Sequence, residues 1–304
     1  MSNIPRIISA KDILEMKVES TPCLLDPIFP KVGLIALAGS SDTGKSSLMR
    51  QLCIDIVTGA DSFIGYKINS RYKRVLYVST EDGIEAISTL LRMQNKEYNH
   101  SSAKFGNLDY LFDSNNLTED LKIIMSNHSY DLIVIDAFAD IFGKDINQSN
   151  QVRCFLNDFS MLAEKYKCLI AFVHHTGKAS ELKAPNKNNL LGTQGFEAKM
   201  RLVAMLVRHT TNNHLRYFCI VKGNYLPEHI KTEALELRFD ENMTFSRTGK
   251  RESIENLSKD DSQKQKEELV MKLYGEGKSQ IYIAKTLGLS QSTVSRIINL
   301  VRYL

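Results

Sequence analysis

The sequence has no tryptophan, and its 304 residues include only six prolines and five cysteines. The cysteines are Cys23, Cys53, Cys154, Cys168 and Cys219, and no two of them form a C-x-x-C pair. Their odd number argues against a disulfide framework, and their spacing argues against a zinc knuckle. We therefore expect a reduced, cytoplasmic protein.

Long hydrophobic runs are also missing. No apolar run reaches the roughly 18 residues that a membrane-spanning helix needs. The amino-terminal stretch MSNIPRIISAKDILEMK has no continuous apolar segment behind a basic cluster, so it does not resemble a secretion signal. Hydrophobic residues make up 43% of the chain and charged residues 24%, a balance that excludes a fully disordered protein. We expect a globular chain without membrane contacts.

Positive charge exceeds negative charge only slightly, by +4, and this excess is concentrated at one end. Residues 269–304 hold five basic residues and one acidic residue, Glu276, so their local excess equals that of the whole chain. The preceding residues 249–266 are polar and nearly free of large apolar side chains, which is typical of a linker or an exposed helical lead-in. The sequence therefore predicts a domain over 1–248, a polar linker over 249–266 and a small unit over 267–304.

Short apolar runs alternate with amphipathic stretches through the large domain. Strand candidates are 34–38, 74–79, 132–135 and 168–173, and helix candidates begin at 45 and cover 84–93, 121–125 and 152–166. Continuous apolar strands separated by helices predict an α/β fold with a mostly parallel sheet flanked by helices. Four later strand candidates with short connections, 201–208, 214–222, 234–239 and 243–245, predict an antiparallel extension.

The clearest motif is the glycine-rich segment GSSDTGKS at 39–46, which fits G-x-x-x-x-G-K-[ST]. In such a P-loop, backbone N–H groups surround phosphate oxygens, Lys45 reaches the β- and γ-phosphates, and the Ser46 hydroxyl binds Mg²⁺. A buried strand precedes it and a helix follows, which favours this interpretation over a glycine turn that binds nothing. The expected phosphate-binding residues are Gly39, Ser40, Ser41, Asp42, Thr43, Gly44, Lys45, Ser46 and Ser47.

Acidic residues follow two of the predicted strands. Asp136 ends the run DLIVID, where it can hold a water on Mg²⁺, or alternatively cap the next turn. Glu81 follows the strand at 74–79 and can position the attacking water for hydrolysis. Asp82 competes for that role, but an acidic residue that stabilises a helix N-terminus fits Asp82 better than Glu81.

The paired histidines His174 and His175 end another predicted strand. One of them could sense the γ-phosphate, although a histidine in such a pair is more often a satisfied, half-buried side chain. No third ligand has suitable spacing for a metal site. The loop over 177–195 is long, polar and lysine-bearing, with Lys178, Lys183 and Lys187, and loops of this length are usually functional or mobile.

Together these motifs, with KGNY at 222–225 and TPCLLD at 21–26, resemble the RecA-like hexameric ATPases of the plasmid RepA helicase type. The resemblance covers roughly residues 20–246. It implies an ATP-driven homo-oligomeric ring, most simply a hexamer, with ATP and Mg²⁺ bound between subunits. It assigns the base role to Glu81, γ-phosphate sensing to His175, an arginine finger donated to a neighbour to Arg201, and a second interface cation to Lys222.

The resemblance also implies that single-stranded DNA passes through a central channel. The lysine-bearing loop at 177–195 could contact its phosphates. An exposed charged loop without that role is an alternative that the sequence leaves open.

Residues 279–298 resemble a helix-turn-helix DNA-binding unit, a small all-α addition to the P-loop core. Ser279 and Ser290 are good helix N-caps, and Gly288 lies where the turn needs a positive φ. The second helix would offer groups that reach bases and phosphates of duplex DNA: Gln291, Ser292, Thr293, Ser295 and Arg296. A small helical oligomerisation unit is the alternative.

These features favour an ATP-hydrolysing, DNA-associated motor. The resemblance implies a RepA-type hexameric helicase that acts in the replication of a plasmid, phage or integrated element. Two alternatives remain at this point. One is a DNA-binding regulator in which ATP switches assembly without unwinding, and the other is a recombination ATPase that forms filaments.

Overall fold

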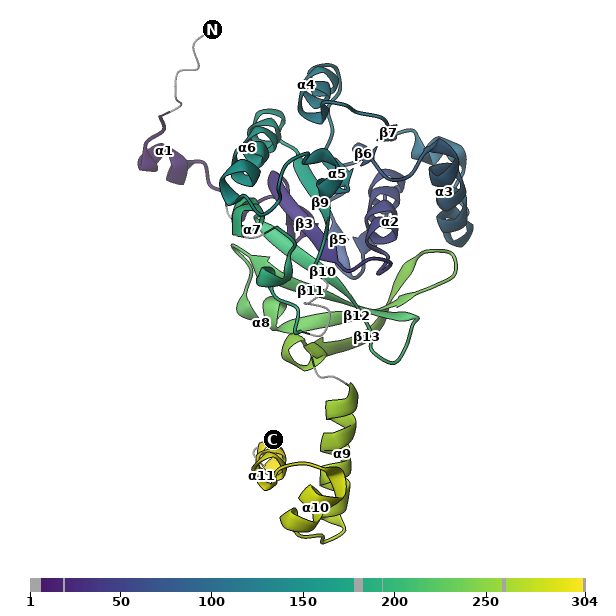
Figure 1. Cartoon of the computed structure of the whole chain (residues 1–304). Coiled ribbons are helices and arrows are strands. Elements are labelled where there is room, and N and C mark those ends of the chain that lie inside the picture. The colour runs from purple at the N-terminus through teal and green to yellow at the C-terminus, as the bar shows by residue number, and fades with distance from the viewer. Residues whose placement is uncertain (1–6, 19, 178–182, 193, 259–260, 303–304) are drawn as a thin grey trace.

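The computed structural model describes residues 7–18, 20–177, 183–192, 194–258 and 261–302 (Figure 1). Its main element is a nine-stranded sheet in the order β13-β12-β11-β10-β3-β9-β8-β6-β7. The fold is α/β with a mostly parallel central sheet flanked by helices, as the sequence predicts. No helix in the described part of the chain is long and apolar enough to cross a bilayer.

Five parallel strands form the half of the sheet that carries the motifs. They are β3 (Gly33–Gly39), β9 (Leu169–His175), β8 (Leu132–Asp136), β6 (Val75–Ser79) and β7 (Leu108–Leu111). Alternate residues of a strand face opposite sides of a sheet, so a strand covered on both sides must be apolar throughout. In β3, Ile35 and Leu37 pack with α2 (Lys45–Thr58), whereas Leu34 and Ala36 pack with α6 (Ser149–Tyr166).

The antiparallel extension also forms. β10 (Leu202–Arg208) pairs in parallel with β3 and antiparallel with β11 (Leu215–Gly223), and β12 (Glu233–Phe239) and β13 (Phe245–Ser253) follow. The last strand is much longer than the predicted 243–245. Most of its side chains are exposed because it is the edge strand, so its polar sequence resembles a linker.

The predicted linker over 249–266 is therefore wrong at both ends. Residues 249–253 belong to β13, and the short helix η4 (Ile254–Ser258) follows with Ile254 buried in the large core. At the other end, α9 already begins at Asp261. Ordered structure in the large domain thus extends ten residues beyond the predicted boundary at 248, to Ser258.

Smaller elements surround the sheet. A four-stranded sheet has the order β2 (Phe29–Pro30), β1 (Cys23–Asp26), β5 (Tyr66–Ile68) and β4 (Ser62–Phe63). In the described residues the large domain has these further helices: α1 (Ala10–Glu15), α3 (Ile84–Tyr98), η1 (Ser102–Phe105), α4 (Leu117–Asn127), α5 (Phe138–Ile141), η3 (Lys187–Asn189), α7 (Gln194–Lys199) and α8 (Glu228–Thr232).

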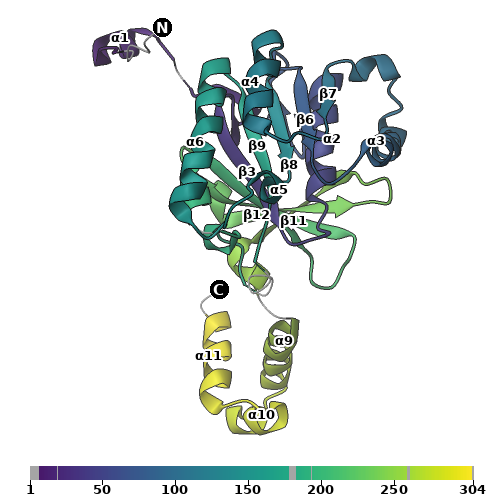
Figure 2. The same ribbon diagram turned by 45° about the horizontal axis from the view of Figure 1, so that its top comes forward.

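Three helices form a group of their own at the carboxyl end: α9 (Asp261–Gly275), α10 (Gln280–Leu287) and α11 (Gln291–Arg302) (Figure 2). Val270 of α9, Ile283 of α10 and Val294 of α11 meet in a separate hydrophobic cluster. The Ser279 side chain accepts a hydrogen bond from the Tyr282 N–H, and Gly288 ends α10 with φ +62°. A helix, a turn and a second helix therefore occupy the segment that the sequence indicates.

Candidate active site

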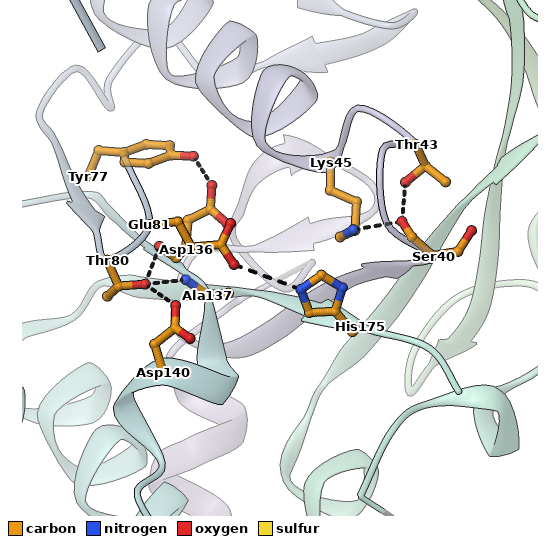
Figure 3. A network of polar contacts seen from close by, with 10 residues as sticks. All are labelled: Ser40, Thr43, Lys45, Tyr77, Thr80, Glu81, Asp136, Ala137, Asp140 and His175. Carbon is orange, nitrogen blue, oxygen red and sulfur yellow. Dashed lines mark hydrogen bonds and ion pairs between the residues drawn. The ribbon is translucent and has the colours of Figure 1, made fainter. Parts of the chain in front are cut away.

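The glycine-rich segment forms a tight loop between the end of β3 and the start of α2 (Figure 3). Gly44 has φ +93°, and a Cβ there would lie 2.8 Å from the Phe245 ring. A Cβ on Gly39 would lie 2.5 Å from the Leu206 carbonyl oxygen. Only glycine fits these two positions, because the first needs a left-handed backbone and both have no room for a side chain. The loop can therefore expose backbone N–H groups at the N-terminus of α2, as a phosphate site requires.

Lys45 is the cation of this loop. Its side chain is only 6% exposed, and its Nζ donates a 2.8 Å hydrogen bond to the Ser40 carbonyl oxygen. The Thr43 hydroxyl donates to the same oxygen at 3.0 Å. Burial lowers the pKa of Lys45, and the charges of Asp136 and Glu81 oppose this effect. The ammonium group thus stays inside the loop, where an anion would be held.

Asp136 lies at the carboxyl end of β8, next to the first turn of α2. Its carboxylate accepts a 2.5 Å hydrogen bond from the Tyr77 hydroxyl of β6 and another from the Ser46 hydroxyl. Burial raises the pKa of Asp136, while these hydrogen bonds and the nearby Arg50 oppose the rise. A carboxylate and a hydroxyl in contact supply the hard oxygen ligands that Mg²⁺ prefers. The residues present therefore fit a magnesium site.

Glu81 faces the same space from the turn after β6. Its Oε1 atom is 4.0 Å from Nε2 of His175, which ends β9 (Figure 3). Burial, followed by the charges of Asp136 and Asp140, raises the pKa of Glu81. Burial and the charge of Lys45 lower the pKa of His175, which favours its neutral form. Glu81 is placed to accept a proton.

The Thr80 hydroxyl ties the turn that carries Glu81 to the neighbouring strand end. It accepts the Ala137 N–H at 2.8 Å and lies 2.5 Å from the Asp140 carboxylate. These contacts join the carboxyl ends of β6 and β8, and so fix the acidic residues relative to one another.

These groups line one cavity of about 470 Å³, which includes Lys45, Ser46, Glu81, Asp136 and His175. The structure thus brings together five residues that the sequence placed at a phosphate-transfer site. Phe239 and Met243, from the end of β12 and the turn after it, complete the wall. These two residues could not be predicted, because nothing in their local sequence pattern points to the distant P-loop.

Two further arginines that the sequence analysis missed brace the P-loop from the antiparallel extension. Arg208 at the end of β10 donates to the carbonyl oxygens of Ser41 and Asp42, at 3.3 and 3.0 Å. Arg216 of β11 is only 6% exposed and donates from Nε to the Thr43 carbonyl oxygen at 3.0 Å. The sequence signal that could have identified them is the presence of an arginine in each of two largely apolar strands, β10 and β11.

Arg201 and Lys222 do not join this cavity. The Arg201 side chain lies over Gly33, at the opposite end of β3 from the P-loop, and pairs with Glu164 at 3.1 Å. Six strand residues separate that point from the loop, roughly 20 Å. Lys222 is paired with Glu197 at 2.8 Å. Within one chain, neither cation reaches the cavity.

The two histidines have different surroundings. His174 is fully buried between the rings of Phe138 and Phe196, and its Nε2 is 2.7 Å from the Leu191 carbonyl oxygen. Burial lowers the pKa of His174 to about 4, so it is a neutral core residue. His175 alone faces the cavity.

Of the lysines in the following loop, Lys178 lies outside the described residues. Lys183 is exposed, and Lys187 lies 4.0 Å from Glu197.

On α11, Gln291, Ser292 and Arg296 are exposed, whereas Thr293 and Ser295 are half-buried. The Ser290 hydroxyl lies 2.9 Å from that of Ser292 and 2.8 Å from that of Thr293. Two hydroxyls of the predicted DNA-binding face therefore also take part in the helix cap.

Comparison with known proteins agrees with this fold. A family model described as an AAA domain matches residues 6–181. Among solved structures, one described as an ATPase domain is similar with a TM-score of 0.55 at 13% identity, covering 78% of this chain and 95% of that chain. That likeness concerns the fold alone, which is RecA-like. No curated protein matches the sequence. Because the family model spans more than half of the chain and includes the P-loop, Glu81 and Asp136, the chain belongs to the AAA domain family.

Proposed function

We propose that this protein is an ATP-hydrolysing, DNA-associated motor. One observation carries the enzymatic part: Lys45, Ser46, Glu81 and Asp136, from three separate strand ends, line a single cavity at a phosphate-binding loop. Family membership supports nucleotide binding, because the matched region contains all four residues.

Each residue has a defined task in this proposal. The loop N–H groups and Lys45 bind the β- and γ-phosphates, and Ser46 and Asp136 would hold Mg²⁺. A bound Mg²⁺ would neutralise charge on the transferring phosphoryl group. Glu81 orients the attacking water and accepts its proton, and its raised pKa makes it a stronger base than a glutamate with the ordinary pKa. His175 contacts the γ-phosphate end and Glu81.

The finer proposal is a ring of the RepA type, with six copies as the simplest form. Arg201 is compatible with a site shared between copies, because its side chain is partly exposed and lies at the opposite end of β3 from the P-loop of its own chain. A neighbouring copy could present it to the cavity as an arginine finger, with Lys222 nearby. The setting would be replication of a plasmid, phage or integrated element.

DNA would be contacted in two places. We propose that α10 and α11 form a helix-turn-helix that binds duplex DNA, with Gln291, Ser292 and Arg296 exposed for contact and Thr293 and Ser295 at its margin. Lys183 and Lys187 would meet single-stranded DNA in the ring.

A second candidate is a DNA-binding regulator in which ATP switches assembly of the protein and no DNA is unwound. The separate hydrophobic cluster of α9–α11 favours this candidate, because a tethered duplex-binding unit does not require a motor. A recombination ATPase that forms filaments is a third.

One experiment separates these functions. ATP hydrolysis is measured with and without single-stranded DNA. The mass of the protein assembly is measured in the presence of a non-hydrolysable ATP analogue. A motor shows rapid turnover that single-stranded DNA stimulates, and a closed assembly of fixed mass. Slow turnover with a tight duplex site indicates the regulator, and an assembly of open-ended mass indicates a filament.

A further inference from the structure

Arg50, on the second turn of α2, is a buried charge that the proposed mechanism does not use. Its side chain is 1% exposed, and neither Nε nor Nη1 has a hydrogen-bond partner in the described parts of the chain. Burying an arginine without compensation strongly destabilises a fold. Such a group in a native structure calls for an explanation.

The groups around Arg50 include supports of the active site, and the Tyr110 hydroxyl of β7 is a further side-chain neighbour. Nη2 lies 3.8 Å from Oδ2 of Asp82, which directly follows Glu81. The guanidinium carbon is 6.0 Å from the ring centre of Tyr77, whose hydroxyl holds Asp136. Arg50 itself does not line the cavity. With its side chain 1% exposed, Arg50 is closed off from a ligand in the cavity.

The sequence predicts that Asp82 stabilises the N-terminus of the following helix, but Asp82 is not the cap residue of α3. The N-cap of α3 is Gly83, which makes no side-chain capping bond, and the acidic residue of the first turn is Glu85. The Ser79 hydroxyl donates to the Asp82 carbonyl oxygen at 2.8 Å, which closes the turn around Thr80 and Glu81. Asp82 is thus both the end of this turn and the partner of Arg50.

We propose that Arg50 is a positioning residue for hydrolysis: by pairing with Asp82 from behind, it fixes the turn that aims Glu81 into the cavity. The inference rests on the proposed ATPase function and extends it to residues outside the cavity.

Charge balance supports this role. Glu81, Asp82, Asp136 and Asp140 crowd the carboxyl ends of β6 and β8, and like charges repel. The positive charge of Lys45 offsets this negative charge from the cavity, and the positive charge of Arg50 offsets it from the core. Without Arg50, Asp82 would lose its partner and repulsion would move the turn outward. The distance from Glu81 to the attacking water would then change, while the P-loop, formed by other residues, would stay in place.

The test uses the full-length protein and compares Asp82→Asn, Arg50→Gln and Arg50→Lys. Asp82 is 42% exposed, so its amide variant should fold. We expect Asp82→Asn and Arg50→Gln each to lower kcat by about tenfold, with the Kd for ATP, measured by calorimetry, within about twofold of wild type. The double variant should be no slower than the slower single variant, because the two residues act as a pair. Arg50→Lys, which keeps the charge, should recover part of kcat.

Glu85→Gln is the matched control, since it removes an exposed acid from the same region without touching Arg50. It should leave kcat unchanged. The inference would be overturned if folded Asp82→Asn had the wild-type kcat, or lost no more kcat than Glu85→Gln does. It would also be overturned if Asp82→Asn bound ATP more weakly with a normal kcat, or if the losses of the two single variants added up in the double variant. If Arg50→Gln fails to fold, Asp82→Asn against Glu85→Gln still decides. A wild-type protein without ATP hydrolysis would contradict the proposed function itself, whereas an active wild type with an unaffected Asp82→Asn contradicts this inference alone.

Discussion

The Tyr77 hydroxyl of β6 donates a 2.5 Å hydrogen bond to the Asp136 carboxylate at the end of β8. Both side chains are buried, and burial together with the adjacent Asp136 charge raises the pKa of Tyr77, so the phenol remains a donor at every physiological pH. The carboxylate expected to hold Mg²⁺ is therefore oriented by the neighbouring strand.

Removing this hydroxyl should weaken the metal site. We expect Tyr77→Phe to raise the Mg²⁺ concentration needed for half-maximal ATP hydrolysis by about 10- to 100-fold, the usual effect of losing a group that orients a metal ligand. Tyr130→Phe is the matched control, because it removes a similar Tyr–Asp hydrogen bond, to Asp109, outside the cavity. Equal Mg²⁺ requirements in both variants would contradict the assignment of Asp136.

A mixing experiment tests whether Arg201 acts on a neighbouring copy. Lys45→Ala and Arg201→Ala should each be inactive alone, but mixed assemblies should recover activity, because one variant supplies an intact cavity and the other supplies the arginine. Lys45→Ala mixed with Glu81→Gln should show no recovery, since both changes damage the same cavity. Steady-state ATP turnover of the mixtures is the measurement. No recovery in the first mixture, with assembly intact, would exclude the trans role.

The sequence predicted those parts of the site that depend on local pattern. Continuous apolar runs predicted β3 and β8. Asp136 could therefore be located at the end of β8, and Lys45 in the loop that follows β3. The Arg216–Thr43 contact spans 173 residues and depends on the pairing of β10 with β3 and β11, which no local pattern encodes. Residues 249–253 of the edge strand β13 were mistaken for the start of a linker, because an edge strand needs few apolar residues.

The proposed duplex-binding face depends most on Arg296, which is exposed on α11. We expect Arg296→Ala to weaken duplex binding by about 1–3 kcal/mol, with basal ATP hydrolysis unchanged. Arg92→Ala, which removes an exposed arginine from α3, should alter neither. Fluorescence anisotropy with labelled duplex at fixed salt measures the affinity. An unchanged affinity in Arg296→Ala would contradict the recognition-helix assignment.

Asp55, on α2, should make stability depend on pH. Burial raises its pKa to about 7, against about 4 when unfolded. Between about pH 4 and pH 7 the folded chain keeps this proton while the unfolded chain has lost it. The stability that protonated Asp55 contributes is therefore complete below about pH 4, declines as the pH rises, and is lost once the pH has passed about 7. Each pKa unit corresponds to about 1.4 kcal/mol.

Asp55→Asn should remove this decline and raise the free energy of unfolding at pH 8 relative to wild type. Asp61→Asn, at an exposed position, is the control and should leave the pH profile unchanged. Urea unfolding between pH 5 and 8 measures the effect. A wild-type profile for Asp55→Asn would show that Asp55 ionises normally.

The central claim is that the loop around Lys45 binds a nucleoside triphosphate with Mg²⁺. Isothermal titration of Mg²⁺–ATP into the full-length protein tests it most directly, with Lys45→Ala as the comparison. We expect saturable binding by the wild-type protein. We expect loss of both binding and hydrolysis in a folded Lys45→Ala protein that still binds duplex DNA through residues 267–304. Loss of duplex binding in that folded variant would contradict the modular arrangement. Absence of ATP binding by wild type, or equal binding by Lys45→Ala, would contradict the claim itself.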